Sequence, residues 1–115
     1  MNVISDAKLN LERDLKNLIA GEWVDSKEKI EVTNPYTNEI VGTVPRMGLD
    51  QVKEAIDALY EYEPTLTAYE RSEILKGTAD EITSRKDELA YGISLESGMS
   101  IKDSTKEVGR GVNLI

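Results

Sequence analysis

The spacing of apolar residues changes near residue 46, and this change limits the folds that the chain can adopt. Before it, residues 30–33 and 40–44 form short runs rich in β-branched side chains, each bounded by turn residues, which is typical of strands. After it, apolar residues recur every three to four positions, as in amphipathic helices. We therefore expect an α+β arrangement, with β-hairpins over residues 18–46 followed by helices over residues 47–115.

Turn residues separate the predicted strands. Pro35 fixes its own φ and disfavours helix at Asn34, while Thr37 and Asn38 have side chains that bond the local backbone, so a bend is expected between the two β-branched runs. Gly21 stands between two earlier apolar runs, where a tight turn needs a residue that accepts positive φ. The sequence thus predicts two successive hairpins.

The first predicted helix follows these hairpins. Gly48 or Asp50 is expected to open it, and Pro64 ends it, because proline lacks the N–H that a helix interior requires. Its apolar positions share one stripe, which predicts packing against a sheet or other helices rather than a ligand site. The stripe consists of Val52, Ala55, Ile56, Leu59 and Tyr60.

Further helices are predicted by their caps. Thr67 and Glu70 form a capping-box pattern at the start of the second helix. We expect a break near residues 83–86, where Ser84 is a candidate cap for the next segment, and a left-handed end at Gly98. A last helix is expected from Ser100 or Asp103.

Composition excludes several function classes. The 115 residues carry a net charge of −8, which argues against nucleic acid or an anionic membrane as partner. No stretch approaches the ~20 apolar residues needed to span a bilayer, and the start lacks the pattern of a secretion signal, so we expect a cytoplasmic protein. With no cysteine and no histidine, the usual zinc ligands and catalytic triads are missing.

The remaining polar patterns predict no reactive site. Glu61 with Glu63, and Asp80 with Glu81, are expected to be solvated surface carboxylates rather than acid–base pairs. The run 109–111, Gly-Arg-Gly, lacks the third glycine and the preceding strand of a phosphate loop. From the residues alone we therefore expect no catalytic, cofactor-binding or metal-binding residue in this chain.

Several short sequence motifs occur in an order and spacing that resemble the amino-terminal segment of the NAD(P)-dependent aldehyde dehydrogenase superfamily. Each motif alone is a weak signal. The resemblance covers about residues 18–115. Within the superfamily, the sequence is similar to that of the branch that acts on lactaldehyde or phosphonoacetaldehyde. Met99 and Ser100 depart from it, since lysine and proline commonly follow this glycine in the family. The matching motifs lie at residues 19–23, 34–39, 44–45, 50–60, 70–75, 87–90 and 96–98.

The resemblance implies a domain organisation and an incomplete enzyme. Residues 1–17 would be an amino-terminal arm, and residues 18–115 a truncated amino-terminal part of the cofactor-binding domain of the α/β aldehyde dehydrogenase fold. The cysteine nucleophile, the general-base glutamate, the oxyanion-hole asparagine and the glycine-rich cofactor turn would lie after residue 115. The parent enzyme would use NAD or NADP as an oxidoreductase, whereas this chain alone would bind no cofactor and be inactive.

Some members of the family hold a structural cation at positions that correspond here to Thr33 and Glu96, and a turn without any ion is the favoured alternative. Three functional interpretations stay open. The chain is part of an aldehyde dehydrogenase with a structural role, a complementing subunit of a split enzyme, or an acidic interaction module that kept only the fold. Its expected partners are the rest of such a chain or another subunit, with a homo-oligomer possible.

Overall fold

A computed structural model describes residues 14–115 and divides them into two compact units. One unit contains residues 14–33 and 39–65, and the other contains residues 34–38 and 66–115. Most of the predicted amino-terminal arm, residues 1–13, lies outside the described residues. The domain boundaries expected from the sequence stay a prediction, and the two units are described separately below.

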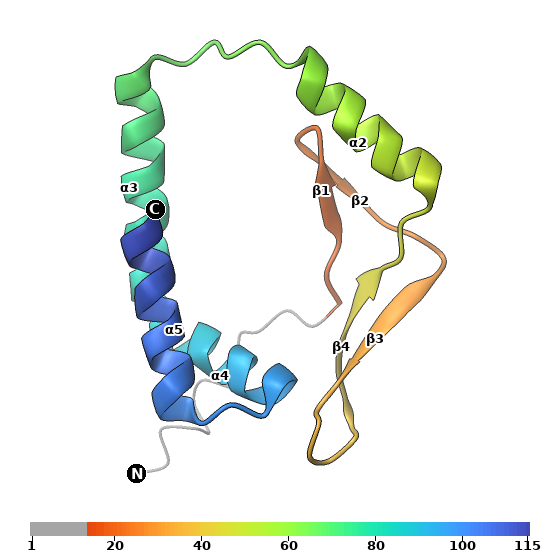
Figure 1. Ribbon diagram of the computed structural model, residues 1–115, viewed down its shortest axis with the longest axis vertical. Helices are drawn as coiled ribbons and strands as arrows, with labels where there is room; N and C mark the ends of the chain where they lie inside the picture. The colour runs from red at the N-terminus through yellow and green to blue at the C-terminus, as the bar shows by residue number, and fades with distance from the viewer. Residues whose placement is uncertain (1–13) are drawn as a thin grey trace. The chain divides into compact units, whose positions relative to one another are not determined.

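The first unit begins with a small hairpin (Figure 1). Strands β1 (Asn17–Ile19) and β2 (Glu22–Val24) pair antiparallel, with Leu18 opposite Trp23. The turn residues Ala20 and Gly21 have φ of 51° and 81°. Positive φ at both central positions is the geometry of the tight turns that match strand twist, which explains the predicted need for Gly21. Ala20 belongs to the turn rather than to the strand.

The second hairpin pairs β3 (Lys29–Thr33) with β4 (Ile40–Pro45), as the β-branched runs predict. The pairing is antiparallel, and the register shifts between Val32 and Thr33. Asp14 forms a bridge to Thr43 and accepts a hydrogen bond of 2.9 Å from its hydroxyl. The Asn17 amide donates to the Pro45 carbonyl at 3.4 Å, which ties the two hairpins together.

Helix α2 (Leu49–Glu61) completes this unit. Gly48 is its N-cap, as expected, and the Gly48 N–H donates to the Gln51 side chain at 3.0 Å. The helix ends before Pro64, also as expected. Its small residues Ala55 and Ala58 are half-buried, whereas the larger apolar residues of the stripe are exposed. The helix therefore contacts its unit through its alanines, and its large apolar side chains stay exposed.

The tip of the β3–β4 hairpin belongs to the second unit. The Asn34 side-chain oxygen accepts hydrogen bonds from the N–H groups of Tyr36 and Thr37, at 2.9 and 3.0 Å, and the Asn38 N–H donates to the Asn34 carbonyl at 2.8 Å. Asn38 adopts a left-handed φ of 59°. The predicted bend is confirmed, and the Asn34 side chain bonds its backbone.

Three helices form the rest of the second unit: α3 (Ala68–Ser84), α4 (Lys86–Ser97) and α5 (Ile101–Leu114). The Thr67 hydroxyl accepts from the Glu70 N–H at 3.2 Å, and the Glu70 carboxylate accepts from the Thr67 N–H at 2.7 Å. The predicted capping box is thus confirmed. The Ser100 hydroxyl likewise caps α5 by accepting from the Asp103 N–H at 3.2 Å.

The break between α3 and α4 lies where the sequence predicts it, but the expected cap is wrong. Arg85 is the residue between the helices, with φ of −102° and ψ of 18°. The Ser84 hydroxyl instead donates back to the Glu81 carbonyl at 2.8 Å, inside α3. A serine in a last helical turn has such a carbonyl within reach, and this bond competes with capping the next helix.

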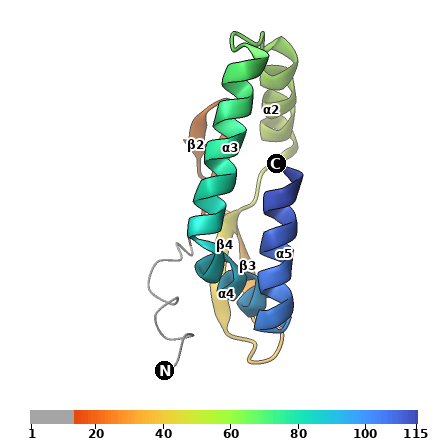
Figure 2. The same ribbon diagram turned by 90° about the vertical axis from the view of Figure 1, so that its left-hand side faces the viewer.

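The most buried residues of the described chain lie on α4 and α5, which pack against each other, and α3 runs beside α5 (Figure 2). Ala90, Tyr91 and Val108 are buried there together with Gly92, Ser104 is fully buried, and Pro45 on β4 is the buried residue of the first unit. Gly98 ends α4 in the left-handed region at φ of 72°, as predicted. Within residues 14–115, no helix is both long and apolar enough to cross a bilayer.

Candidate functional site

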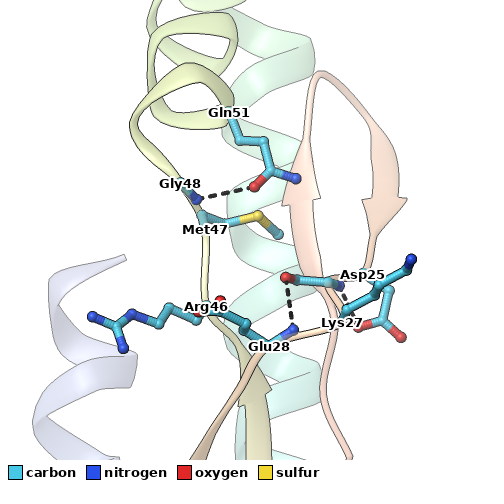
Figure 3. A pocket seen from close by; sticks show the side chains of 8 residues that line it. Asp25, Lys27, Glu28, Arg46, Met47, Gly48 and Gln51 are labelled. Atoms are coloured by element: carbon cyan, nitrogen blue, oxygen red, sulfur yellow. Dashed lines mark hydrogen bonds between the residues drawn. The ribbon is translucent and has the colours of Figure 1, made fainter.

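A polar groove lies in the first unit, where the loop after β2 meets the start of α2 (Figure 3). Its volume is about 490 Å³. Charged, amide and hydroxyl groups dominate the lining, with one methionine. The lining residues are Asp25, Ser26, Lys27, Glu28, Arg46, Met47, Gly48 and Gln51.

Short-range hydrogen bonds hold this groove in shape. The Asp25 carboxylate accepts from the Ser26 N–H at 2.7 Å, and the Ser26 hydroxyl accepts from the Glu28 N–H at 3.3 Å. The Arg46 N–H donates to the Glu28 carbonyl at 2.9 Å, continuing the β3–β4 ladder to the groove. These bonds organise a loop and a helix start, so the groove is explained by the local backbone.

The groove carries charged side chains of both signs, and they are not arranged for acid–base chemistry. Asp25 pairs with Lys29, and hydrogen bonding from Lys29, helped by the Ser26 N–H, lowers the pKa of the Asp25 carboxyl below its ordinary value. An exposed carboxylate with a lowered pKa stays ionised and is a poor general acid or base near neutral pH. The groove contains no thiol and no imidazole, and nothing in it activates the Ser26 hydroxyl, which already serves as an acceptor.

A second hollow of about 520 Å³ lies in the other unit, between the end of α3 and the last turns of α5. Lys86, Lys106 and Arg110 are the cations in its lining. Lys106 pairs with Asp103 at 3.0 Å and Arg110 with Glu107 at 2.6 Å, each one turn back on α5. Because these partners neutralise two of the three cations, the hollow offers no concentrated positive field for an anion.

The remaining polar patterns named in the sequence analysis lie on exposed or helical positions. The two carboxylate pairs at 61 and 63 and at 80 and 81 are exposed, as predicted. The Gly-Arg-Gly run at 109–111 lies inside α5, where its backbone forms helix rather than a loop. Among residues 14–115, no group of three histidine, cysteine or acidic side chains is placed to hold a metal ion. Thr33 and Glu96 belong to different units, so the implied cation site stays a prediction.

One buried polar group was missed by the sequence analysis. Ser104 is fully buried, and its hydroxyl has no hydrogen-bond partner within the described structure. It follows Ser100 by one helical turn and precedes Val108 by another, so a period of four on α5 marks the buried face. A small residue at this position suits close packing of α4 and α5, which accounts for its burial.

Two antiparallel hairpins followed by helices define an α+β structure with few buried residues in its described part. A family model described as the aldehyde dehydrogenase family matches residues 23–115. The chain belongs to the aldehyde dehydrogenase family. The resemblance expected from the sequence is confirmed, and the observed elements are a part of that fold.

Curated relatives match this chain over a limited part of their own length. A lactaldehyde dehydrogenase of Methanococcus aeolicus is 41% identical over 97 residues, which are 82% of this chain and 21% of the relative. The succinate-semialdehyde dehydrogenase GabD of Escherichia coli, named for NADP⁺, is 37% identical over 103 residues, which are 85% of this chain and 21% of the relative. The chain thus spans about a fifth of the length of these relatives.

Solved structures agree with this assignment. Aldehyde dehydrogenase 21 of Physcomitrella patens, solved with the reaction product succinate, superposes with a TM-score of 0.82 at 31% identity, covering 90% of this chain and 22% of that one. An NAD-dependent aldehyde dehydrogenase of Sinorhizobium meliloti gives a TM-score of 0.81 at 30% identity, covering 93% and 23%. Both neighbours hold the matching elements within a chain about four times as long.

Proposed function

We propose that this chain serves as the amino-terminal portion of an NAD(P)-dependent aldehyde dehydrogenase, with a structural role, and that it has no activity alone. The complete enzyme would oxidise an aldehyde to a carboxylic acid and transfer a hydride to NAD⁺ or NADP⁺. The observation that carries the proposal is the match of residues 23–115 to the family, set beside a sequence without cysteine. In the family, a cysteine thiolate attacks the aldehyde.

The described residues do not fit a nicotinamide dinucleotide. Gly109 and Gly111 are the glycines with phosphate-loop spacing, and they lie inside α5, where the backbone N–H groups are committed to helical bonds. The polar groove has neither such a turn nor an apolar floor. We therefore assign the cofactor, whether NAD or NADP, to the part of the enzyme that this chain does not contain.

The lack of a self-contained core supports the structural role. The buried apolar side chains of the described part of the chain are few, namely Pro45, Ala90, Tyr91 and Val108, while many large apolar side chains are exposed. Exposed apolar surface of this extent marks interaction surface rather than an independent catalyst. We assign the chain to the cytoplasm on the composition argument alone, and we expect any homo-oligomer to form through the complete enzyme.

A chimera tests the proposal. In the Methanococcus aeolicus lactaldehyde dehydrogenase, the matched amino-terminal segment is replaced by this chain, and aldehyde-dependent NAD(P)H formation is followed by absorbance. We expect an active chimera and no turnover by this chain alone, with lactaldehyde and succinate semialdehyde both offered. An inactive chimera, in a preparation whose circular dichroism matches the relative, would contradict the proposal, and so would turnover by the chain alone.

Two alternatives have distinct outcomes. If the chain is a complementing subunit, activity also appears when it is co-expressed with the remaining part of the relative as a separate polypeptide. If it is an acidic interaction module, the chimera is inactive and the chain binds other proteins. The net charge of −8 is the feature that motivates the module, because it favours basic partners.

A further inference from the structure

Helix α2 has an apolar face that its own unit does not cover. Leu49, Val52, Ile56 and Leu59 follow one another at spacings of three, four and three residues, which places them on one stripe of the helix. Their exposed fractions are 70%, 44%, 58% and 77%. We call these four residues the α2 stripe. They are the large aliphatic residues of the helix, and Tyr60 next to Leu59 is exposed as well.

The orientation of α2 makes this exposure informative. The half-buried positions of the helix are Gln51, Ala55 and Ala58, which lie to one side of the stripe. The helix therefore already has contact with its own unit through small side chains, and its large apolar side chains point elsewhere. A surface helix of a self-sufficient domain shows the opposite pattern, because burying a large apolar side chain stabilises more than burying an alanine.

The face of α2 opposite the stripe indicates which side of the helix a partner would leave in solvent. Asp50, Glu54, Asp57 and Glu61 are exposed and acidic and follow one another at spacings of four, three and four residues. This acidic ridge lies on the far side of the helix from Val52 and Ile56, so it stays solvated when the stripe is covered. A partner would meet an apolar surface of about three helical turns, bounded by Lys53 on one edge.

We propose that the α2 stripe is a docking surface for the remaining part of the aldehyde dehydrogenase chain, with Ile56 at its centre. This inference depends on the proposed function, because it names the partner of the same structural role. The argument for this occupant is length: the matched neighbours are about four times as long and hold the same elements, so most of the surface available to α2 comes from sequence beyond the matched segment. A second copy of this chain is the competing occupant.

Two matched substitutions test the docking surface. Ile56→Asp places a short carboxylate in the stripe, and Glu54→Asp places the same residue in the same part of the helix, on the acidic ridge. Both variants are made in this chain alone and in the active chimera described above. Because Ile56 is 58% exposed, neither variant should change the helical circular dichroism or the urea midpoint of the chain alone.

In the chimera the two variants should differ. Ile56→Asp is expected to shorten the half-life of activity at a fixed elevated temperature by at least about tenfold. The substitution removes the apolar contacts of Ile56 and buries a carboxylate charge, and both changes weaken docking. Glu54→Asp is expected to stay within about twofold of the unsubstituted chimera. This contrast, together with unchanged stability of the chain alone, supports the proposal.

Other outcomes overturn the inference in recognisable ways. Equal half-lives for the two variants in an active chimera would overturn the docking surface and leave the proposed function standing. Loss of helical structure in Ile56→Asp of the chain alone would show that the stripe is covered within the chain. Concentration-dependent association of this chain, abolished by Ile56→Asp, would assign the surface to a second copy. An inactive unsubstituted chimera would overturn both proposals.

Discussion

Gly98 in the second unit is predicted to tolerate exchange for alanine poorly. It ends α4 at φ of 72°, and a Cβ built on it would stand 3.0 Å from Pro35 Cγ at the tip of the β3–β4 hairpin. The left-handed region costs an ordinary residue about 1 to 2 kcal/mol, and a contact this close forces the proline ring to move. We expect Gly98→Ala to lower the free energy of unfolding by about 2 kcal/mol.

Gly77 supplies the matched control. It lies inside α3, and a Cβ there would have no atom within 4 Å. Gly77→Ala should therefore raise the free energy of unfolding by up to about 1 kcal/mol, through helix propensity alone. Urea unfolding followed by circular dichroism measures both variants, and an unchanged slope with denaturant shows that the midpoint shift reports stability.

A third variant separates the two causes at Gly98. Pro35→Ala removes the ring atom nearest the new Cβ but leaves the left-handed backbone in place. If the contact contributes, the double variant Pro35→Ala with Gly98→Ala loses less than the sum of the single losses. The reasoning is refuted if Gly98→Ala unfolds at the wild-type midpoint, or if Gly77→Ala is as destabilising as Gly98→Ala.

The remaining predictions concern single local features. Ala20→Asn should stabilise the β1–β2 hairpin by about 1 kcal/mol, because asparagine tolerates the positive φ at this turn better than alanine, and a lower urea midpoint would contradict this. Ser104→Ala should raise the free energy of unfolding by about 1 kcal/mol, because it removes a buried hydroxyl without a partner, and a loss of stability would instead reveal a bond that Ser104 makes. Thr67→Ala should cost about 1 kcal/mol near neutral pH. The Thr67 N–H, and after it the Thr67 hydroxyl, donate to the Glu70 carboxylate and lower its pKa below the ordinary 4.5, so these two bonds stabilise above pH 4.5 and are lost as the pH falls. Thr67→Ala removes only the hydroxyl, so its difference from wild type should shrink in part in acid, and a constant difference from pH 7 to pH 3 would refute a contribution of the bond from the hydroxyl to the carboxylate.

Local signals in the sequence predicted the elements well because their causes are local. The Thr67 capping box, the left-handed end at Gly98 and the serine cap at Ser100 each depend on atoms within about four residues along the chain. Where two local bonds compete, the sequence pattern does not decide between them. Ser84 was expected to cap α4, and its hydroxyl bonds the Glu81 carbonyl instead. Such a choice depends on how the chain turns at Arg85, which the sequence pattern does not specify.

Contacts between distant residues were beyond the sequence argument. The polar groove joins Glu28 to Gln51 through the path of β3 and β4, and no motif marks that pair. The burial of Ser104 likewise follows from how closely α4 and α5 pack, since serine is usually exposed. Periodicity placed Val52, Ile56 and Leu59 together on one face of α2, but it missed Leu49, included the half-buried Ala55, and predicted packing for side chains that are exposed. It cannot distinguish an apolar face that meets its own domain from one that awaits another part of the fold.

The caps and the uncovered stripe together explain how such a segment is organised. A helix of 13 residues such as α2 is marginal in water on propensity alone, so in most proteins tertiary packing stabilises it. Here the cap at Gly48 and the half-buried Ala55 and Ala58 specify where the helix forms, whereas its large apolar residues stay exposed. Local chemistry thus positions α2 in advance, and the free energy available from covering Ile56 and its neighbours is left for association with the rest of the enzyme. Preparing the helix before docking lowers the conformational entropy lost on binding, which is why capping and exposure occur together on α2.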